Sequence, residues 1–264
     1  MSADTVRQKI VIDTDPGQDI DDLLAMAFAR KRPELDVRAI TTVTFPARGR
    51  VRLVKRLLRY LGCMDIPVGA GMSYPLRPLR EAEKASLHDL SGSMNHACFA
   101  EPEDPRDAPG EEDAVDLITR TIEEHEGEIV LACIGPLTNV ACALQRKPGL
   151  AAKIQYIAMM GGESALNRRE HNVAFDPMAA EIVLASGVPV YMGTWDVTRR
   201  LVLNGEDCAA LREKGGDLGR ALAEAVDHWH PAQSWKPGPV MYDLFAVVWA
   251  FDRSYFEIEP KSLW

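Results

Sequence analysis

The sequence lacks the features of several large protein classes. It has five cysteines, an odd number, and no Cys-x-x-Cys pair, so neither a disulfide framework nor a zinc knuckle is indicated. No apolar run approaches the roughly 20 residues of a membrane span, and the N-terminus has no basic segment followed by an apolar one. We therefore expect a protein of the reducing cytoplasm with no membrane partner.

The chain also lacks an excess of positive charge. Thirty Lys and Arg residues stand against 39 Asp and Glu, a formal net charge of -9, which argues against nucleic acid as the main partner. We find no internal repeat and no low-complexity segment. The 264 residues are 47% hydrophobic, enough to bury the core of an α/β domain, and we predict a single domain over residues 1–264.

The most informative segment is residues 13–22, Asp-Thr-Asp-Pro-Gly-Gln-Asp-Ile-Asp-Asp, which directly follows the apolar run Ile10-Val11-Ile12. Five carboxylates in one short turn repel one another and raise one another's pKa, and a divalent cation is the usual way to stabilise them. The alternative is a solvated acidic loop that caps the next helix. A cap needs only one or two carboxylates, so the cluster favours a cation site.

Alternating strand and helix patterns predict the fold. Apolar runs indicate strands at 9–12, 37–43, 67–70, 129–134, 154–160 and 189–193, and helical periodicity indicates helices at 23–32, 50–61, 113–126, 178–186, 218–230 and 245–251. The turn at 135–139 opens a further helix through residue 144, and residues 196–198 begin another helical region. This alternation predicts an α/β protein with an open, mostly parallel sheet flanked by helices and a Rossmann-like core. Residues 71–110 are expected to be loop-rich and to form a lid or binding loop.

A few polar and aromatic residues outside the acidic turn have two interpretations each. Asp243 precedes the last apolar helix and is either a cap or, with Asp15 and Asp22, a ligand of a hard cation such as calcium, which takes about 6 to 8 oxygen ligands. His88 is either a substrate contact or a surface histidine. His228 and Trp229 are either part of a base pocket or part of an aromatic hinge packed on the core.

Several motifs occur in one order along the chain. They are Asp-x-Asp-Pro-Gly followed by Asp-Asp at 13–22, Ala-Ile-Thr-Thr-Val at 39–43, Pro-Val-Gly-Ala-Gly at 67–71, Gly-Pro-Leu-Thr-Asn at 135–139, Met-Gly-Gly at 160–162, Glu-x-Asn with Asp-Pro-x-Ala-Ala at 170–180, and Tyr-Asp at 242–243. In this order they resemble the calcium-dependent nucleoside hydrolases, often called inosine-uridine preferring. That family hydrolyses the N-glycosidic bond of nucleosides to ribose and free base.

The resemblance implies a calcium site. Asp15, Asp22 and Asp243 match calcium ligands, and Asp15 also matches the general base toward the metal-bound water. Ile134 matches a residue that offers calcium only its backbone carbonyl. Asp13 is similar to a carboxylate that orients the turn.

The resemblance also implies a substrate site for a small-molecule nucleoside. Asp21, Glu170 and Asn172 match ribose-binding positions, and Asn167 stands where a further ribose-binding asparagine is expected. Tyr242 replaces the histidine that can protonate the leaving base, so it is a catalytic candidate. The family further implies a homodimer or homotetramer and a role in nucleoside salvage.

Four departures limit this comparison. Two extra residues add Asp19 to the acidic turn, where it could compete for the metal, and Phe45-Pro46 replaces the family's Gly-Asn. The loop before Glu170 is short. The chain ends at Trp264, before the family's usual C-terminal segment, so we expect either a shortened chain or a compact variant.

Two alternatives follow from these departures and from the acidic turn. One is a ribosyl-compound binding protein that keeps the metal and sugar site without turnover. The other is a phosphohydrolase with an aspartate nucleophile, suggested by Asp13-x-Asp15 after a strand, although no clear downstream lysine and acidic pair supports it.

Overall fold

The protein contains one parallel sheet in a computed structural model that describes residues 7–91, 94, 96–165, 168–234 and 237–261. The six strands, all paired in parallel, run in the order β3-β2-β1-β4-β5-β6. Their bounds are Gln8–Thr14 (β1), Leu35–Thr42 (β2), Val68–Ala70 (β3), Ile129–Cys133 (β4), Ile154–Met160 (β5) and Val190–Gly193 (β6). The predicted fold class, an open parallel sheet flanked by helices, is confirmed.

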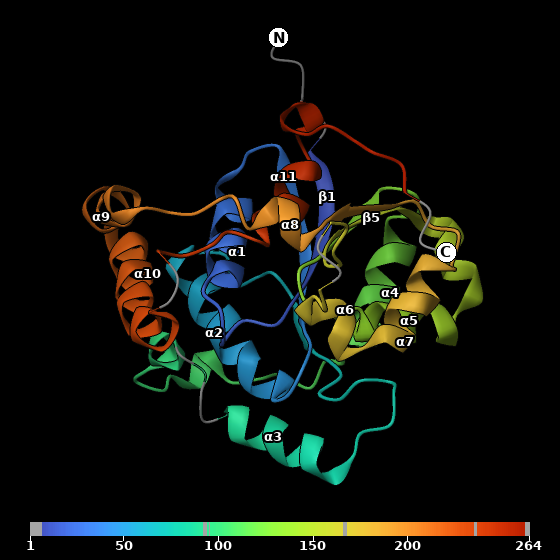
Figure 1. The fold of residues 1–264 in the computed structure, drawn as a ribbon, viewed down its shortest axis with the longest axis horizontal. Coiled ribbons are helices and arrows are strands. Elements are labelled where there is room, and N and C mark those ends of the chain that lie inside the picture. The colour runs from blue at the N-terminus through green and yellow to red at the C-terminus, as the bar shows by residue number, and fades with distance from the viewer. Residues whose placement is uncertain (1–6, 92–93, 95, 166–167, 235–236, 262–264) are drawn as a thin grey trace.

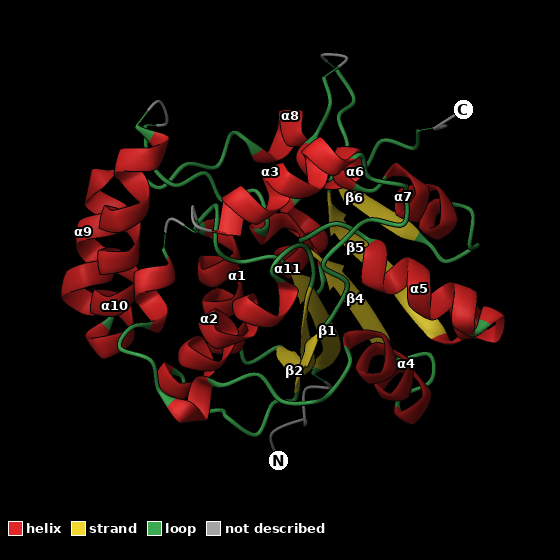
Figure 2. Ribbon diagram, turned by 90° about the horizontal axis from the view of Figure 1, so that it is seen from below, coloured by secondary structure: helices red, strands yellow, loops and turns green. Residues whose placement is uncertain are grey.

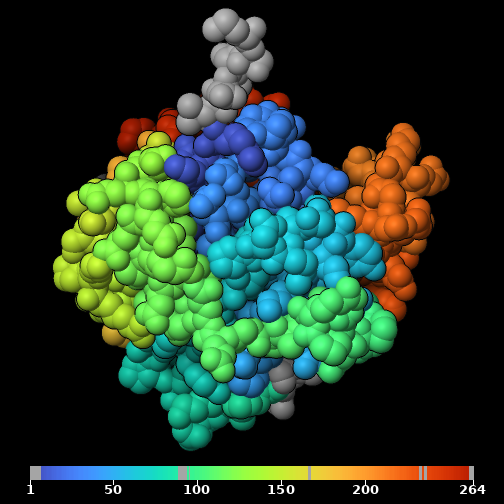
Figure 3. All heavy atoms as spheres, turned by 180° about the vertical axis from the view of Figure 1, so that it is seen from behind, coloured from blue at the N-terminus to red at the C-terminus, as the bar shows by residue number. Residues whose placement is uncertain are grey.

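Helices cover both faces of this sheet. The α-helices are α1 (Asp21–Lys31), α2 (Ala47–Tyr60), α3 (Glu81–Ser91), α4 (Ala114–Glu124), α5 (Thr138–Arg146), α6 (His171–Phe175), α7 (Pro177–Leu184), α8 (Trp195–Thr198), α9 (Gly205–Lys214), α10 (Gly216–Trp229) and α11 (Leu244–Trp249). In Figures 1 and 2, α1, α2, α9 and α10 lie on one side of the strands, and α4, α5 and α7 lie on the other. α9 and α10 form the orange projection at the edge of the molecule in Figure 3.

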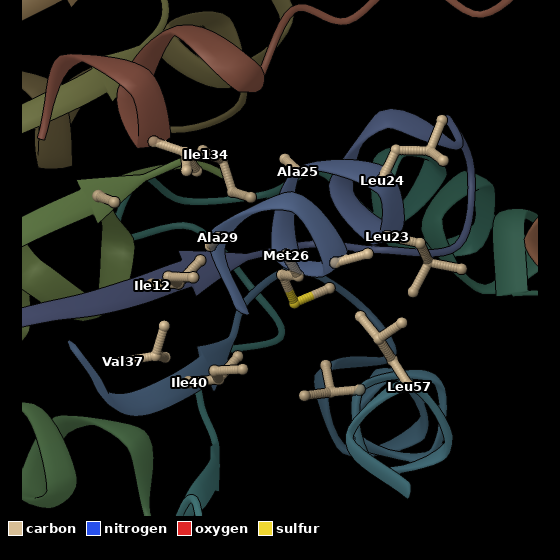
Figure 4. Close-up of a cluster of buried hydrophobic side chains, with 14 of the residues drawn as sticks. Ile12, Leu23, Leu24, Ala25, Met26, Ala29, Val37, Ile40, Leu57 and Ile134 are labelled. Carbon is tan, nitrogen blue, oxygen red and sulfur yellow. The ribbon is translucent and has the colours of Figure 1, made fainter. Parts of the chain in front are cut away.

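Strand alternation divides the core into two clusters. Ile10 and Ile12 of β1 belong to the cluster under α1, α2 and α11, whereas Val11 belongs to the cluster under α4, α5 and α7. This is expected because successive side chains of a strand point to opposite faces. Figure 4 shows the first cluster. In this view Met26 of α1 lies between Ile12 of β1 and Leu57 of α2.

Three helices, α3, α6 and α9, were missed by the sequence patterns. Residues 71–110 contain α3 and two 3-10 turns, Ala97–Ala100 and Pro105–Asp107, although this stretch was expected to be loop-rich. Helix α9 buries none of its residues, so it has no apolar periodicity to detect, and a capping box at Asn204 begins it. No helix among the described residues is both long enough and apolar enough to cross a membrane.

A buried ion pair ties the segment after α3 to α2. The Asp107 carboxylate is 2% exposed and accepts hydrogen bonds from Arg56 Nε at 2.7 Å and Arg59 Nη2 at 2.6 Å. Asp107 ends the polar run 101–107 and is buried nonetheless. Its burial is sustained by these two guanidinium partners.

We expect Asp107→Asn to destabilise the protein by about 3 kcal/mol, because it leaves the buried Arg56 charge without its counter-ion. For a domain of this size, this corresponds to a Tm lower by about 6 to 12 °C in thermal unfolding. Asp104→Asn is the matched control, since Asp104 pairs with Arg59 and Arg106 nearer the surface. It should cost less than about 1 kcal/mol. Equal losses in the two variants would contradict the prediction.

Candidate active site and metal centre

The acidic turn lies where the strand order of the sheet reverses. β1 is hydrogen-bonded to β2 on one side and to β4 on the other, so chain connections leave β1 and β4 in opposite directions. Ligands of open α/β sheets bind outside the carboxyl ends of the strands at such a point. The turn from Asp15 to Ile20 occupies this place and leads directly into α1.

The last two residues of β1 point to opposite faces and fix the turn from both sides. Asp13 Oδ1 accepts hydrogen bonds from Thr41 Oγ1 at 2.6 Å and from Asn139 Nδ2 at 2.8 Å. On the other face, Thr14 Oγ1 donates to Asp22 Oδ1 at 2.5 Å. Asp13 thus anchors the turn to β2 and α5, in agreement with the orienting role that the resemblance implies, and Thr14 anchors the first turn of α1.

Three buried carboxylates from opposite ends of the chain meet beside this turn. Oxygen atoms of Asp21, Asp22 and Asp243 all lie within 4.8 Å of one another, and each residue is at most 5% exposed. The backbone N–H of Asp243 also donates to Asp21 Oδ2 at 3.3 Å. The sequence predicted that Asp15, Asp22 and Asp243 converge. Asp22 and Asp243 do, and the third member of the observed cluster is Asp21 rather than Asp15.

Helix α11 carries Asp243 to this position. Its residues Ala246, Val247 and Trp249 are buried in the core cluster, and the helix packs against α1 and β5. Because Asp243 directly precedes α11, apolar packing of the helix brings the carboxylate to the start of α1.

Asp15 lies at the edge of the three-carboxylate cluster. Its N–H donates to Asp22 Oδ1 at 3.0 Å, and its Oδ2 accepts from Thr44 Oγ1 at 3.2 Å. A Cβ atom at Gly135 would lie 2.9 Å from Asp15 Oδ1, so the glycine makes room for this carboxylate beside β4. Asp15 is only half-buried, which leaves it accessible from solvent.

Arg50 is a part of the site that the sequence patterns did not identify. Its guanidinium is almost fully buried and donates to the carbonyl oxygens of Asp15 and Pro16 in the acidic turn, and to those of Thr44 and Phe45 in the loop after β2. One side chain therefore ties the acidic turn to the neighbouring loop. In the sequence it was only one of several basic residues in an amphipathic helix.

The Ile134 carbonyl, a predicted metal ligand, is held by Asn172. The Asn172 side-chain amide donates to this carbonyl oxygen at 3.2 Å and to that of Met160 at 3.2 Å. The Ile134 N–H donates to the Asp13 carbonyl at 2.8 Å, and this bond holds the end of β4 beside β1. Asn172, predicted to bind ribose, thus also orients the carbonyl at the end of β4.

Glu170, the other predicted ribose ligand, caps α6. Its Oε1 accepts from the Asn172 N–H at 2.7 Å, and its Oε2 accepts from the N–H groups of Gly162 and Val173 at 2.9 Å each. The carboxylate is buried and still lies close enough to Asp15 to help raise the pKa of that residue. Asn167, predicted beside it, lies outside the described residues.

Three rings gather beyond the ends of β2 and β3. The Phe45 and Tyr74 rings stack with centroids 5.8 Å apart, and His88 lies 4.3 Å from Phe45. Tyr74 Oη and His88 Nε2 are 3.1 Å apart. Phe45 and Tyr74 were not predicted as site residues, but Phe45 was recognised as a departure from the family pattern.

The remaining aromatic candidates lie on two different elements. Tyr242, next to Asp243, is hydrogen-bonded to Trp195, and burial together with Asp19 and Asp21 raises the pKa of Tyr242 to about 12. Trp229 of α10 is fully buried in the core cluster, as the hinge interpretation expected, and His228 faces solvent on the same helix.

Crowding and burial leave the negative charges of these carboxylates poorly compensated. Burial raises the pKa of Asp22 to about 8, and the Asp15 charge adds to the shift. Burial also raises the pKa of Asp15 to about 7 although Arg50 opposes it, and the pKa of Asp243 lies well above its usual value through burial and the charges of Asp21 and Asp22. Protonation or a bound cation is needed to relieve this repulsion.

This donor set fits a hard divalent cation. Carboxylate oxygens from Asp21, Asp22 and Asp243 converge within 4.8 Å. Asp13 Oδ2 is also buried without a hydrogen-bond partner. Oxygen-rich sites without nitrogen or sulfur ligands suit Ca²⁺ or Mg²⁺.

Comparison with known proteins defines the family. The sequence profile of the inosine-uridine preferring nucleoside hydrolases matches residues 10–263. The pyrimidine-specific ribonucleoside hydrolases RihA of Escherichia coli O1:K1 / APEC and of Salmonella typhimurium (strain LT2) are each 36% identical over 259 residues, covering 94% of this chain and 80% of the relative. The chain therefore belongs to the inosine-uridine preferring nucleoside hydrolase family, as its motifs predicted.

Solved structures of nucleoside hydrolases agree with this family assignment. A purine-preferring ribonucleoside hydrolase from Gardnerella vaginalis superposes with a TM-score of 0.79 at 27% identity, covering 93% of this chain and 80% of that one. The plant nucleoside hydrolase PpNRh1 gives a TM-score of 0.78 at 27% identity, with 94% and 79% covered. The predicted enzyme class, a hydrolase of the N-glycosidic bond of ribonucleosides, is confirmed.

The raised carboxylate pKa values predict how pH affects stability without metal. Asp15 and Asp22 have pKa values of about 7 and 8, above the unfolded value near 3.9, so unfolding releases their protons and stability falls as pH rises toward 8. Burial, and then Arg50, lower the pKa of His96 to about 3, which acts in the opposite direction but only below about pH 6.5. We therefore expect the Tm in chelator to fall from pH 6.5 to pH 8.

The same measurement in excess calcium is the control. A bound cation compensates the negative charge of the carboxylates in place of the protons. The decline in Tm between pH 6.5 and 8 should therefore be smaller. A metal-free Tm that rises over this interval would contradict the assignment of raised pKa values to these carboxylates.

Proposed function

We propose that the protein hydrolyses ribonucleosides to ribose and free base with a Ca²⁺ ion held by Asp15, Asp22, Asp243 and the Ile134 carbonyl. The observation that carries the metal site is the convergence of buried carboxylates from α1 and from the start of α11 within 4.8 Å. When bound, such a cation lowers the pKa of a coordinated water and holds the vicinal hydroxyls of the ribose.

Asp15 is the proposed general base. It is the accessible carboxylate of the group, and beside the cation it can accept a proton from the coordinated water. Arg50 supports this role because it holds the backbone of Asp15 in place through the Asp15 carbonyl. Asp21 is proposed to bind a ribose hydroxyl, and Asn172 to support the sugar site through the Ile134 carbonyl.

The bond that breaks joins C1′ to the base nitrogen. The electron pair leaves with the base while positive charge develops on the ribosyl ring, and the surrounding carboxylates stabilise that charge. We propose that Phe45, Tyr74 and His88 border the base, because these rings gather at the carboxyl edge of the sheet beside the Thr44 that contacts Asp15.

Tyr242 is proposed to donate a hydrogen bond to the substrate without transferring a proton. A phenol whose pKa is raised to about 12 stays protonated at neutral pH and is a poor acid there. We expect Tyr242→Phe to lower kcat/KM by roughly tenfold, the size of one lost hydrogen bond, and to leave the pH profile unchanged. A loss of roughly 10³-fold, or a change in the alkaline limb, would instead identify Tyr242 as the proton donor.

We further propose a preference for pyrimidine nucleosides. The pyrimidine-specific relatives are 36% identical to this chain, whereas the purine-preferring Gardnerella enzyme is 27% identical. The test is a panel of uridine, cytidine, inosine and adenosine assayed for reducing sugar, with calcium and with a chelator. Release of ribose only with calcium, and fastest from uridine or cytidine, is expected. Equal release in chelator would reject the metal role.

The last part of the proposal concerns the cellular compartment and the oligomeric state. All five cysteines are free thiols, which supports a reducing cytoplasm and a role in nucleoside salvage there. We propose a single domain over residues 1–264 that forms a homodimer or homotetramer. Large exposed apolar side chains at Val197, Leu201, Tyr255 and Ile258 support association. Light scattering coupled to size-exclusion chromatography would measure the mass of the assembly.

A further inference from the structure

Thr44 has an unusual backbone conformation beside the proposed active site. Its φ is 62°, and among the residues that the structure describes it is the one residue other than glycine with a positive φ. This left-handed region is unfavourable for a β-branched side chain, so surrounding contacts have to hold Thr44 in it. Strained backbone of this kind occurs at functional sites, where the contacts that hold it are part of the mechanism.

Two hydrogen bonds hold the backbone of Thr44 from different elements. The Thr44 N–H donates to the Met72 carbonyl at 2.9 Å, and Arg50 Nε donates to the Thr44 carbonyl at 3.2 Å. Thr44 is 4% exposed and Arg50 is 2% exposed. The loop after β2 is therefore fixed at Thr44 both by the segment after β3 and by α2.

In this conformation the Thr44 hydroxyl reaches Asp15. Thr44 Oγ1 donates to Asp15 Oδ2 at 3.2 Å. The other carboxylate oxygen, Asp15 Oδ1, lies on the side of Gly135, where a Cβ atom would come within 2.9 Å of it. Gly135 directly follows Ile134, whose carbonyl is a proposed calcium ligand. The bond from Thr44 thus restrains the rotation of the carboxylate and leaves Oδ1 toward the end of β4.

Arg50 holds the backbone that carries the same carboxylate. A guanidinium has five N–H donors, and four of those of Arg50 go to backbone carbonyl oxygens in two loops, those of Asp15, Pro16, Thr44 and Phe45. Lysine cannot reproduce this arrangement, because its ammonium is a point charge without a planar fork of donors. Arg50 therefore fixes the acidic turn and the loop after β2 relative to each other.

Compensation of charge alone does not account for these contacts. Burial lowers the pKa of Arg50, and the charges of Asp15 and Asp22 oppose this shift. A guanidinium that only balanced the acidic cluster would be expected to donate to carboxylates directly, as Arg56 does to Asp107 at 2.7 Å. The hydrogen bonds of Arg50 go to carbonyls instead, and such bonds fix the position of the backbone.

We propose that Arg50 and Thr44 are positioning residues for Asp15, an inference that rests on the proposed calcium-dependent hydrolase function. Arg50 holds the acidic turn and the loop after β2 as one unit, and Thr44 orients the Asp15 carboxylate so that Oδ1 stays available for the cation. The site is thereby formed before the metal binds, so little rearrangement opposes cation binding. The same unit carries Phe45, whose ring is proposed to border the base.

Thr44→Val tests the hydroxyl, because valine keeps the β-branched shape. We expect calcium binding to the metal-free protein, measured by calorimetric titration, to weaken about tenfold, the effect of one lost hydrogen bond to a charged group. In saturating calcium, kcat for uridine should fall about tenfold and KM less than twofold. Thr44→Ser keeps the hydroxyl and should restore most of both. Thr119→Val, which removes a hydroxyl bonded to the Val115 carbonyl in α4, is the matched control and should change neither.

Arg50→Lys tests the fork of donors, because lysine keeps the charge. We expect calcium affinity to fall at least tenfold and KM for uridine to rise, since the Phe45 carbonyl also loses its donor. Arg56→Lys is the control for a simple loss of stability. Arg56 is also buried and donates to backbone carbonyls, but those of Ala100 and Pro102. Its substitution should lower the Tm and change calcium affinity less than twofold.

Arg50→Met separates positioning from charge. If Arg50 acted only through its charge, Arg50→Lys would bind calcium as the wild type does, and Arg50→Met would bind it more tightly because a positive charge near the cation is lost. Weaker binding in both variants supports the inference. The charge-only result overturns it.

Hydrogen exchange in chelator tests the unit without metal or substrate. The N–H of Asp15 donates to Asp22 Oδ1 and that of Thr44 to the Met72 carbonyl. Both amides should exchange about tenfold faster in Arg50→Lys, while the amides of β4 keep their wild-type rates. This result supports the positioning of Asp15 even if no nucleoside is hydrolysed. Unchanged exchange in Arg50→Lys, or equal calcium affinity in the wild type and Thr44→Val, overturns the inference and leaves the proposed function standing.

Discussion

Asp15→Asn is expected to lower kcat for nucleoside hydrolysis by about 10³-fold, within the range that loss of a general base produces. The carboxylate accepts a proton from the attacking water, and an amide of the same shape cannot. Asp15 is also a proposed calcium ligand, so the assay is run at calcium concentrations that saturate the variant. Substrate binding should then change little, because Asp21, Asn172 and Asp243 remain. The loss should therefore appear in kcat rather than in KM, in a steady-state assay of ribose release.

The same variant should be at least as stable as the wild type without metal. Asp15 accepts a single side-chain hydrogen bond, from Thr44, and its charge adds to the repulsion that raises the pKa of Asp22. Removing that charge is expected to raise the metal-free Tm by about 2 to 4 °C, the equivalent of about 1 kcal/mol. Asp116→Asn, an exposed carboxylate on α4, is the control and should change neither property. More than a tenth of wild-type kcat in Asp15→Asn would exclude Asp15 as the base.

The fold could be predicted wherever apolar periodicity and burial coincide. The predicted strand at 154–160 coincides with β5, and the predicted helix at 218–230 differs from α10 by one or two residues at its ends. α3 escaped because prolines flank it, and α9 escaped because it buries no residue. Helices that pack weakly on the core leave no apolar signal in the sequence.

The site residues also divide into those that the sequence revealed and those that it did not. The acidic turn was visible because five carboxylates in ten residues are unusual in any fold. Arg50 was not, since its partners are backbone carbonyls of two separate loops, and no residue pattern records where a carbonyl points. Asn172 and Glu170 were recognised by motif, but their contacts with Ile134 and with the start of α6 depend on how β4, β5 and α6 pack together.

Asp243→Asn should reverse its effect on stability when calcium is added. In chelator, the variant lacks one of three crowded charges, and the pKa of Asp243 lies well above its usual value because of burial and its acidic neighbours, so the variant should be more stable than the wild type. In calcium, the wild type gains about 2.7 kcal/mol when the free metal is 100 times its Kd. The variant, with one carboxylate ligand fewer, should gain almost nothing at the same concentration.

This reversal distinguishes a metal site from an acidic cluster that merely stabilises the fold. A structural role for Asp243, through its N–H bond to Asp21, would survive the substitution by Asn and would produce no dependence on metal. Asp19→Asn is the informative comparison, because Asp19 is the extra acid of the turn and could compete for the cation. Thermal unfolding of both variants, with and without calcium, gives the answer: if Asp19→Asn shows the reversal and Asp243→Asn does not, the cation is held by the turn alone and the contribution of α11 is excluded.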